Sequence, residues 1–239
     1  MNPTNRSIKK VKGKVKYIDY GTAADFLLLR HYSGRIPVIS YAFGWYVDNE
    51  LAAVCTFGKP ASNSLCTGIC GKEYAGRVFE LNRLCRLEYL KEPLSYFVSA
   101  CLRRLSGDNL IIVSYSDTAM GHHGYLYQAC NFLYTGATKP RTDKYTLGGK
   151  HARHYNKNNA NQLKIFSVID DGNELRVLRS SKHRYVFFAM KDKKLKKKAR
   201  SAMAYSVEPY PKGDNDTYEL GNYLKPVVIS KSEPNKPLD

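Results

Sequence analysis

The stretch Glu92–Asp117, EPLSYFVSACLRRLSGDNLIIVSYSD, indicates which class of fold the chain adopts. Pro93 suits the first turn of a helix. After it, apolar residues recur at three- and four-residue spacing at Leu94, Phe97, Val98, Cys101, Leu102 and Leu105. This spacing predicts a helix with one continuous apolar face. A polar turn at 106–109 ends the helix, and the apolar run Leu110–Tyr115 predicts a fully buried strand.

Similar patterns continue in both directions from this stretch. The sequence predicts a helix over Tyr20–Arg30 and a second one that begins near His123 or Gly124 and runs through Ala129. The predicted strands are Ala42–Val47, Leu51–Phe57, Phe79–Leu87, Phe132–Tyr134 and Arg184–Met190. The alternation of strand and helix after residue 79 predicts an α/β fold with parallel pairing and right-handed crossovers. Ligands of such sheets bind at the carboxyl ends of the strands, where the segment after Val113 lies.

Composition and charge indicate the kind of partner. The 239 residues carry a net charge of +17, from 38 basic and 21 acidic residues. Such an excess favours a polyanion, and we prefer nucleic acid to an anionic membrane surface because no amphipathic basic helix stands out. The basic N-terminus lacks the apolar segment of a secretory signal, so we expect a cytoplasmic protein that does not enter a membrane.

The chain divides by composition into a main domain and two flanking segments. We expect a flexible basic arm at 1–14, a catalytic domain over 15–212 and a weakly ordered tail at 213–239. Within the domain, 138–180 is a polar insertion in which only Leu163–Ile169 has the pattern of a strand. Of the six cysteines, Cys101 and Cys130 are expected to be buried thiols in the core.

The segment Ser114–Tyr127, SYSDTAMGHHGYLY, places titratable and flexible residues at the end of the buried strand. Asp117 would serve as a base or a ligand, and Gly121 and Gly124 would allow close approach of a bound cofactor. Tyr127 would lie in the first turn of the next helix, where its hydroxyl can protonate a leaving group. The alternative, about equally weighted, is a capped loop with a packed tyrosine.

Two further positions are candidates for the same site. Arg83 lies inside a predicted strand, where a charge needs an anionic partner. Glu80 is expected on the opposite face of that strand, so Asp117 or a bound anion is the better partner. His31 follows a predicted helix, and a solvated helix end is the more common role of such a histidine.

Basic residues are concentrated between Arg179 and Arg200, where Asp192 is the only acid. A solvated face normally contains compensating acids, so contact with phosphates is the better interpretation. The residues expected to bind DNA are Arg179, Lys182, Arg184, Lys193, Lys194, Lys196 and Lys197.

Six motifs resemble, in the same order, those of the Mom proteins of bacteriophages. They are HYSG (31–34), TFGKPAS (56–62), FELNRL (79–84), VSYSDTAMGHHGYLYQACNFLYTG (113–136), HRYVFF (183–188) and VEPYPK (207–212). The resemblance implies a GNAT-like acyltransferase fold. It also implies a transferase that adds an acetamide or glycinamide (carbamoylmethyl) group to the exocyclic amine of adenine in DNA and so protects DNA from restriction. Carried over by motif, the functional residues would be His31, Tyr32, Arg83, Ser114, Asp117 and Tyr127.

The donor of the two-carbon unit stays open at this point. GNAT enzymes that bind coenzyme A have a glycine-rich turn after the central strand, where backbone amides hold the pyrophosphate. The corresponding segment 86–93, RLEYLKEP, has no glycine and contains two acids. An acyl-coenzyme A and an aminoacylated RNA are therefore both candidates. The resemblance also implies iron as a candidate metal, with His31 and Asp117 as its ligands.

Two other functions compete with DNA modification. A GNAT-like N-acyltransferase that acts on another amine would have the same fold but little need for such positive charge. A non-catalytic DNA-binding protein would use the charge but would leave Arg83, Asp117 and Tyr127 without a task.

Overall fold

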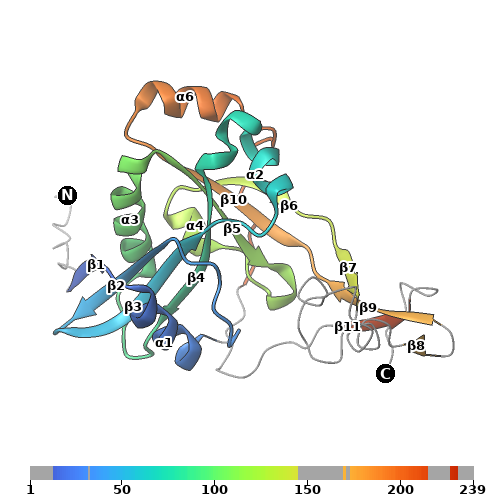
Figure 1. Cartoon of the computed structure of the whole chain (residues 1–239), viewed down its shortest axis with the longest axis horizontal. Helices are drawn as coiled ribbons and strands as arrows, with labels where there is room; N and C mark the ends of the chain where they lie inside the picture. Colours follow the sequence, from blue (N-terminus) through green and yellow to red (C-terminus); the bar gives the residue numbers. More distant parts are fainter. Residues whose placement is uncertain (1–12, 32, 145–168, 171–172, 215–226, 231–239) are drawn as a thin grey trace, which may run out of the picture.

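The chain folds around one mixed β-sheet (Figure 1). The computed structural model describes residues 13–31, 33–144, 169–170, 173–214 and 227–230. The seven strands of the main sheet, in spatial order, are β1 (Lys14–Tyr17), β2 (Tyr41–Val47), β3 (Glu50–Gly58), β4 (Val78–Arg86), β5 (Leu110–Asp117), β10 (Lys182–Ala189) and β6 (Leu133–Ala137). The predicted α/β class is confirmed, and the six predicted strands that lie within the main sheet are present within a few residues of their expected bounds.

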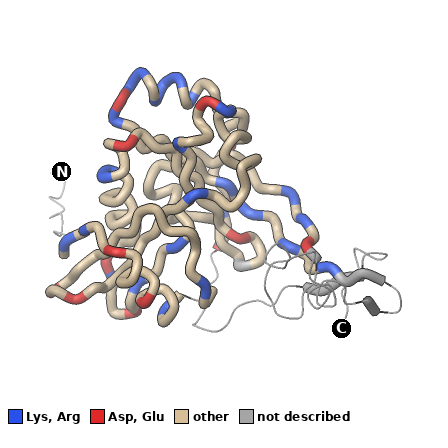
Figure 2. Tube along the Cα trace, in the orientation of Figure 1, with Lys and Arg blue, Asp and Glu red and all other residues tan. Residues whose placement is uncertain are grey.

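The pairing of the central strands agrees only partly with the prediction. β4 and β5 are parallel, as expected, with Val78 opposite Ile111 and Glu80 opposite Val113. β5 and β6 do not pair, because β10 lies between them and is antiparallel to both. β10 therefore runs alongside the whole of β5, since Lys182 lies opposite Asp117 at one end and Ala189 lies opposite Leu110 at the other. Basic residues lie at both ends of this strand (Figure 2).

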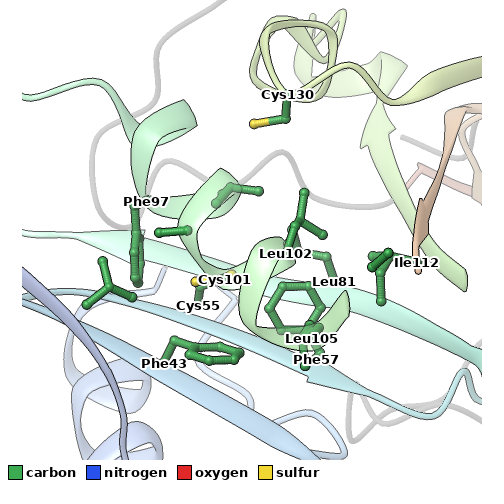
Figure 3. Packing of buried hydrophobic residues seen from close by; sticks show 14 of the residues in the cluster. Phe43, Cys55, Phe57, Leu81, Phe97, Cys101, Leu102, Leu105, Ile112 and Cys130 are labelled. Carbon is green, nitrogen blue, oxygen red and sulfur yellow. The ribbon is translucent and has the colours of Figure 1, made fainter. Parts of the chain in front are cut away.

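One face of the sheet is covered by α3 (Leu94–Leu105) and α4 (Tyr125–Ala129). The apolar face predicted for α3 is the buried one, and Phe97, Cys101 and Leu105 are fully enclosed there. They pack on the alternate residues of the strands that point the same way, including Phe43 and Ile112 (Figure 3). Cys101 and Cys130 are both buried in this layer, as predicted.

The opposite face is covered by two separate groups of helices. α1 (Tyr20–Arg30) begins at Asp19, whose carboxylate accepts hydrogen bonds from the amide and hydroxyl of Thr22 at 2.9 and 2.7 Å. It packs on β2 and β3. At the other end of the sheet, α2 (Asn63–Cys70), the 3-10 helix η1 (Lys72–Arg77) and α6 (Lys193–Ser201) cover β5 and β10. The two apolar clusters on this face are distinct.

The polar insertion forms further strands beyond the end of β5. β7 (Arg141–Lys144) and β11 (Val227–Ser230) flank β9 (Asn173–Arg179), and the two-residue strand β8 (Ile169–Asp170) also pairs with β9. Sequence patterns missed these strands, and most of the expected strand Leu163–Ile169 lies outside the described residues. We expected the tail at 213–239 to be weakly ordered, whereas its residues 227–230 pair with β9.

The segment 202–213 covers β6, the edge strand of the sheet. Its backbone first donates from Ala204 to the carbonyl of Ile69 on α2 and then from Glu208 to Tyr134 on β6, at 2.8 and 2.9 Å. The Tyr210 hydroxyl next donates to the carbonyl of Phe132 at 2.7 Å. The segment therefore passes from one face of the sheet to the other around an edge that would otherwise be open to pairing with another chain.

Candidate functional site

The two parallel central strands part next to the candidate site. β4 pairs with β5 only over Val78–Glu80, although both strands continue beyond that point. Where they separate, the buried Ser114 hydroxyl donates to the carbonyl of Leu81 at 2.9 Å. Ser114, predicted as a site residue, thus holds the two strands together at the last point where they touch.

A β-bulge in β4 changes which residues share a face. Thr56 of β3 lies opposite Arg83, but the next residue, Phe57, lies opposite Leu81, so Asn82 is an extra residue in β4. The bulge is held by side chains. The Thr56 hydroxyl donates to the Asn82 amide oxygen at 2.7 Å, and the Asn82 amide nitrogen donates to the carbonyl of Val38 at 2.8 Å.

Because of this bulge, Glu80 and Arg83 point to the same face of the sheet. Strand alternation predicted opposite faces, and that expectation is wrong. Glu80 is partly buried, and this burial raises the pKa of its carboxyl, while the positive charges of Arg83 and Lys182 act in the opposite direction. Tyr115, on the same face, has a pKa raised by burial and by the charge of Glu80.

Asp117 ends β5 on this face. Its Oδ1 accepts from the Ser180 hydroxyl at 2.5 Å and from the amide of Ala119 at 3.1 Å, and its Oδ2 lies 3.2 Å from the Lys182 ammonium. Partial burial opposes ionisation, but the Ser180 hydroxyl and Lys182 outweigh it and lower the pKa of Asp117 below its ordinary value. Asp117 is therefore an ionised carboxylate at neutral pH.

His31 lies at the end of α1, close enough to Arg83 for their charges to interact. The backbone N–H of Ser33 donates to its Nδ1 at 3.1 Å, and the Ser33 hydroxyl lies 2.9 Å from the same atom. A ring nitrogen that accepts from an amide carries no proton, so the neutral imidazole carries its proton on Nε2. Burial, followed by the charge of Arg83, lowers the pKa of His31 to about 4. His31 is thus a neutral hydrogen-bond donor at pH 7.

Ser114 and Tyr127 belong to the other face of the sheet, because residues alternate along β5 and Tyr127 packs into the cluster beneath α3. The Tyr127 ring lies 5.4 Å from that of Phe132 and 5.2 Å from that of Tyr185. The structure thus brings His31, Arg83 and Asp117 to one face, whereas Tyr127 lies behind the parted strands.

The glycines of this segment have conformational and packing reasons to be there. Gly121 (φ 58°) ends the 3-10 turn η3 (Thr118–Met120), and Gly124 (φ 72°) precedes α4. A Cβ on Gly124 would lie 2.5 Å from the Tyr185 ring. The left-handed φ favours glycine at both positions, and the Tyr185 ring also leaves no room for a Cβ at Gly124, so the structure accounts for both glycines without a cofactor; their contact with one stays a prediction.

The predicted basic segment is divided between the two ends of β10. At the end near Asp117, acids that were thought to be missing are present: Lys182 pairs with Asp117, and Arg179 pairs with Asp143 at 2.9 Å. Arg184 hydrogen-bonds Thr135 and covers the Tyr205 ring at 3.3 Å. These three residues therefore have structural partners within the chain.

The lysines of α6 lie at the far end of β10. They are Lys193, Lys194, Lys196, Lys197 and Lys198, all exposed. The helix was missed in the sequence, although its signals are present: Asp192 caps it through the amides of Lys194 and Leu195, and Leu195 and Ala199 provide apolar contacts at helical spacing. Seven residue steps of β10 separate this end from Lys182, a span of roughly 24 Å.

Several site residues could not be found from sequence patterns, and one predicted residue cannot be placed. Tyr32 lies outside the described residues. Glu80, Asn82 and Ser180 were missed. The pair Glu80–Arg83 would have been recognisable only if the bulge at Asn82 had been known, and Ser180 reaches Asp117 across 63 residues of chain.

The residues present do not fit the iron site that the resemblance implies. Nδ1 of His31 is engaged by the Ser33 amide and Nε2 carries the proton, so neither nitrogen offers a lone pair without rearrangement. Both oxygens of Asp117 already face donors. Among the described residues, no group of three or more His, Cys, Asp or Glu side chains is arranged to hold a metal ion.

The fold and this set of side chains define an α/β protein with charged and hydrogen-bonding groups beside two parting parallel strands, where ligands of such sheets bind. None of its described helices has the length and apolar composition required to cross a bilayer.

Solved acetyltransferases show a loose similarity of fold. They include a Bacillus subtilis acetyltransferase in complex with CoA (15% identity, TM-score 0.41, 74% of this chain and 99% of that one). A GNAT family acetyltransferase from Elizabethkingia anophelis with acetyl-CoA bound is 12% identical with a TM-score of 0.41, and the match covers 75% of this chain and 99% of that one. The Drosophila melanogaster polyamine N-acetyltransferase is 11% identical with a TM-score of 0.42, and the match covers 74% of this chain and 100% of that one. A search of curated proteins finds no significant match.

The Mom protein family model matches residues 12–212, and the chain belongs to this family. Membership of this family supports assignment of the chain to the transferases.

Proposed function

We propose that the protein modifies adenine in double-stranded DNA by transferring an acetamide- or glycinamide-type group to the exocyclic amine, which would protect the DNA from restriction. The main support is the match to the Mom family over residues 12–212, together with the arrangement of His31, Arg83 and Asp117 on one face of the sheet. The net charge of +17 suits a DNA substrate.

The target amine is engaged in base pairing, so the adenine must leave the stack before it reacts. A bond then forms between its N6 and the carbonyl carbon of the acyl donor, the bond from that carbon to the sulfur or oxygen of its carrier breaks, and N6 loses a proton, so that a glycyl donor leaves a glycinamide on N6. Asp117, ionised at neutral pH, is the proposed acceptor of this proton. The Nε2–H of His31 and the guanidinium of Arg83 would stabilise negative charge on the donor.

In this proposal the position of Tyr127 limits which leaving group it can protonate. Because Tyr127 lies behind the sheet, it can protonate only a leaving group that reaches its face through the parting of β4 and β5. An acyl-coenzyme A and an aminoacylated RNA remain the two candidate donors. Tyr32 is proposed to stack on the extruded base.

Mass analysis of nucleosides from plasmid DNA tests this function after the protein is expressed in bacteria. The wild type should yield a modified adenine, and Asp117→Ala should abolish it. Asp214→Ala removes an exposed carboxylate and should leave the yield unchanged. An unmodified adenine peak with soluble, folded wild-type protein would contradict the proposal.

A further inference from the structure

Exposed apolar side chains lie in the last turn of α1 and in the segment that follows it, on either side of His31 in the sequence. Leu29 and Val38 are 69% and 64% exposed, the highest values among the large hydrophobic side chains of the described residues, and Leu28 is 49% exposed. Single exposed aliphatic residues are common, but three within one short segment are a feature that a partner would cover. We call Leu28, Leu29 and Val38 the apolar tip.

The apolar tip is attached to the candidate site through α1 and the segment that follows it. Leu28 lies one helical turn before His31, on a neighbouring part of the helix surface. Val38 is fixed by its carbonyl, which accepts from Asn82 in the bulge next to Arg83. A Cβ on Gly58 would lie 1.8 Å from this same carbonyl, so the segment lies tightly against β3.

Charge around the tip favours a polyanion over a second apolar protein surface. Arg30 and Arg35, both exposed, lie within the same segment as Leu29 and Val38. Asp25 is the acid on the outer face of α1, one turn further from the site. Apolar side chains flanked by arginines fit a nucleic acid, whose base faces are apolar and whose backbone is anionic.

We infer that the apolar tip is a wedge that enters the DNA stack beside the target adenine and fills the space which the extruded base leaves. This inference rests on the proposed function. Leu28 and Leu29 would contact the flanking base pairs, Val38 would support them, and Arg30 would contact a phosphate. The wedge offsets the loss of stacking that accompanies base extrusion, and proteins that kink DNA use aliphatic side chains in the same way.

A binding experiment that needs no donor tests the wedge. The full-length protein is titrated into two fluorescent duplexes that differ only opposite one adenine, which faces either thymine or an abasic position. The double variant Leu28→Ala with Leu29→Ala should bind the paired duplex about ten-fold more weakly, because unpairing is no longer offset. Its affinity for the abasic duplex, where pairing is already lost, should stay within about two-fold of wild type.

Val207→Ala is the control for loss of an exposed aliphatic side chain outside the tip, because Val207 is 53% exposed and lies within the segment that covers β6, on the far side of the main sheet. With 2-aminopurine at the target position, wild type and Val207→Ala should raise fluorescence as the base unstacks, and the Leu28/Leu29 variant should not. Equal losses on both duplexes, or a double variant that behaves like the control, would overturn the wedge.

The two proposals can fail separately. If the wild type modifies plasmid adenine but the tip variants bind both duplexes like wild type, only the wedge is wrong. If the wild type neither modifies adenine nor raises 2-aminopurine fluorescence, the proposed function itself fails.

Discussion

The Ser114 hydroxyl donates a hydrogen bond to the carbonyl of Leu81 at the point where β4 and β5 part. Ser114→Ala removes this bond inside the protein and leaves a buried carbonyl without that donor. We expect a loss of roughly 1 kcal/mol in the free energy of unfolding, measured by urea denaturation. Ser106→Ala, which removes a solvent-exposed hydroxyl bond to Arg103, should cost less. If stability is unchanged but adenine modification is lost, Ser114 acts in the chemistry and not only in the sheet.

Glu80 should make stability depend on pH in a defined direction. Burial raises its pKa above the ordinary 4.5, so the folded state holds this proton more tightly than the unfolded state does. Relative to Glu80→Gln, the wild type should lose stability as pH rises from 4.5 through the folded pKa. Denaturation of both proteins at several pH values measures the difference. Glu88→Gln, at an exposed position, should show no such trend, and a pH-independent difference for Glu80→Gln would contradict the assignment.

Asp117 should show the opposite dependence. Its folded pKa lies below the ordinary 3.8, so its stabilising contribution is present above 3.8 and is lost as pH falls through the folded value. Asp117→Asn should cost roughly 1 to 2 kcal/mol of unfolding free energy near neutral pH, since hydrogen bonds to an ionised group are removed. The cost should shrink on acidification. A cost that stays constant down to pH 2 would exclude the ionised form as its source.

His31 should remain neutral down to about pH 4, with its proton on Nε2. Nitrogen-15 NMR of the imidazole distinguishes the two neutral tautomers and follows protonation during titration. His31→Gln places an N–H donor near the position of Nε2 and should retain part of the adenine modification, whereas His31→Glu should abolish it. A proton on Nδ1, or titration near pH 6.5, would contradict the role as a donor.

The lysines of α6 should contribute to DNA affinity through phosphates alone. Replacing Lys193, Lys194, Lys196 and Lys197 by Ala should reduce the slope of log affinity against log salt concentration by about 0.9 for each phosphate that the variant no longer neutralises. The reduction should be the same for DNA of any sequence. Lys72→Ala with Lys91→Ala, at exposed positions elsewhere, serves as the control. Unchanged affinity at moderate salt would remove α6 from the DNA-binding surface.

Local patterns were sufficient for the elements whose apolar spacing is regular. α3 and β5 follow directly from the run Leu94–Val113, because a helix face and a buried strand each need contiguous or periodic apolar residues. The position of β10 between β5 and β6 depends on pairing between residues that are 46 to 79 positions apart, which no local pattern contains. α6 was hidden because its lysines dominate a helix in which Ala199 is buried and Leu195 is only partly buried.

Single candidate residues could be proposed from the sequence, but their arrangement in space could not. His31, Arg83 and Asp117 were identified through their motifs, and they share a face of the sheet. The bulge at Asn82 was not predictable, because the hydrogen bonds that hold it join Asn82 to Thr56 and Val38, which are distant in the sequence. The separation of Tyr127 from Asp117 follows from strand alternation once α4 is known to cover the other face.

The length of β10 sets a lower limit on the length of DNA that the proposed enzyme can use. In the proposed function, the adenine reacts beside Asp117 at one end of this strand and the lysines of α6 bind phosphates beyond the other end. The two contacts would be separated by roughly 24 Å, or about seven base pairs at ~3.4 Å each. A target adenine closer than that to a duplex terminus would leave α6 with no backbone to hold. Oligonucleotides of a few base pairs should therefore be poor substrates even when they contain the preferred adenine, and efficiency should rise in a step once one flank exceeds this span.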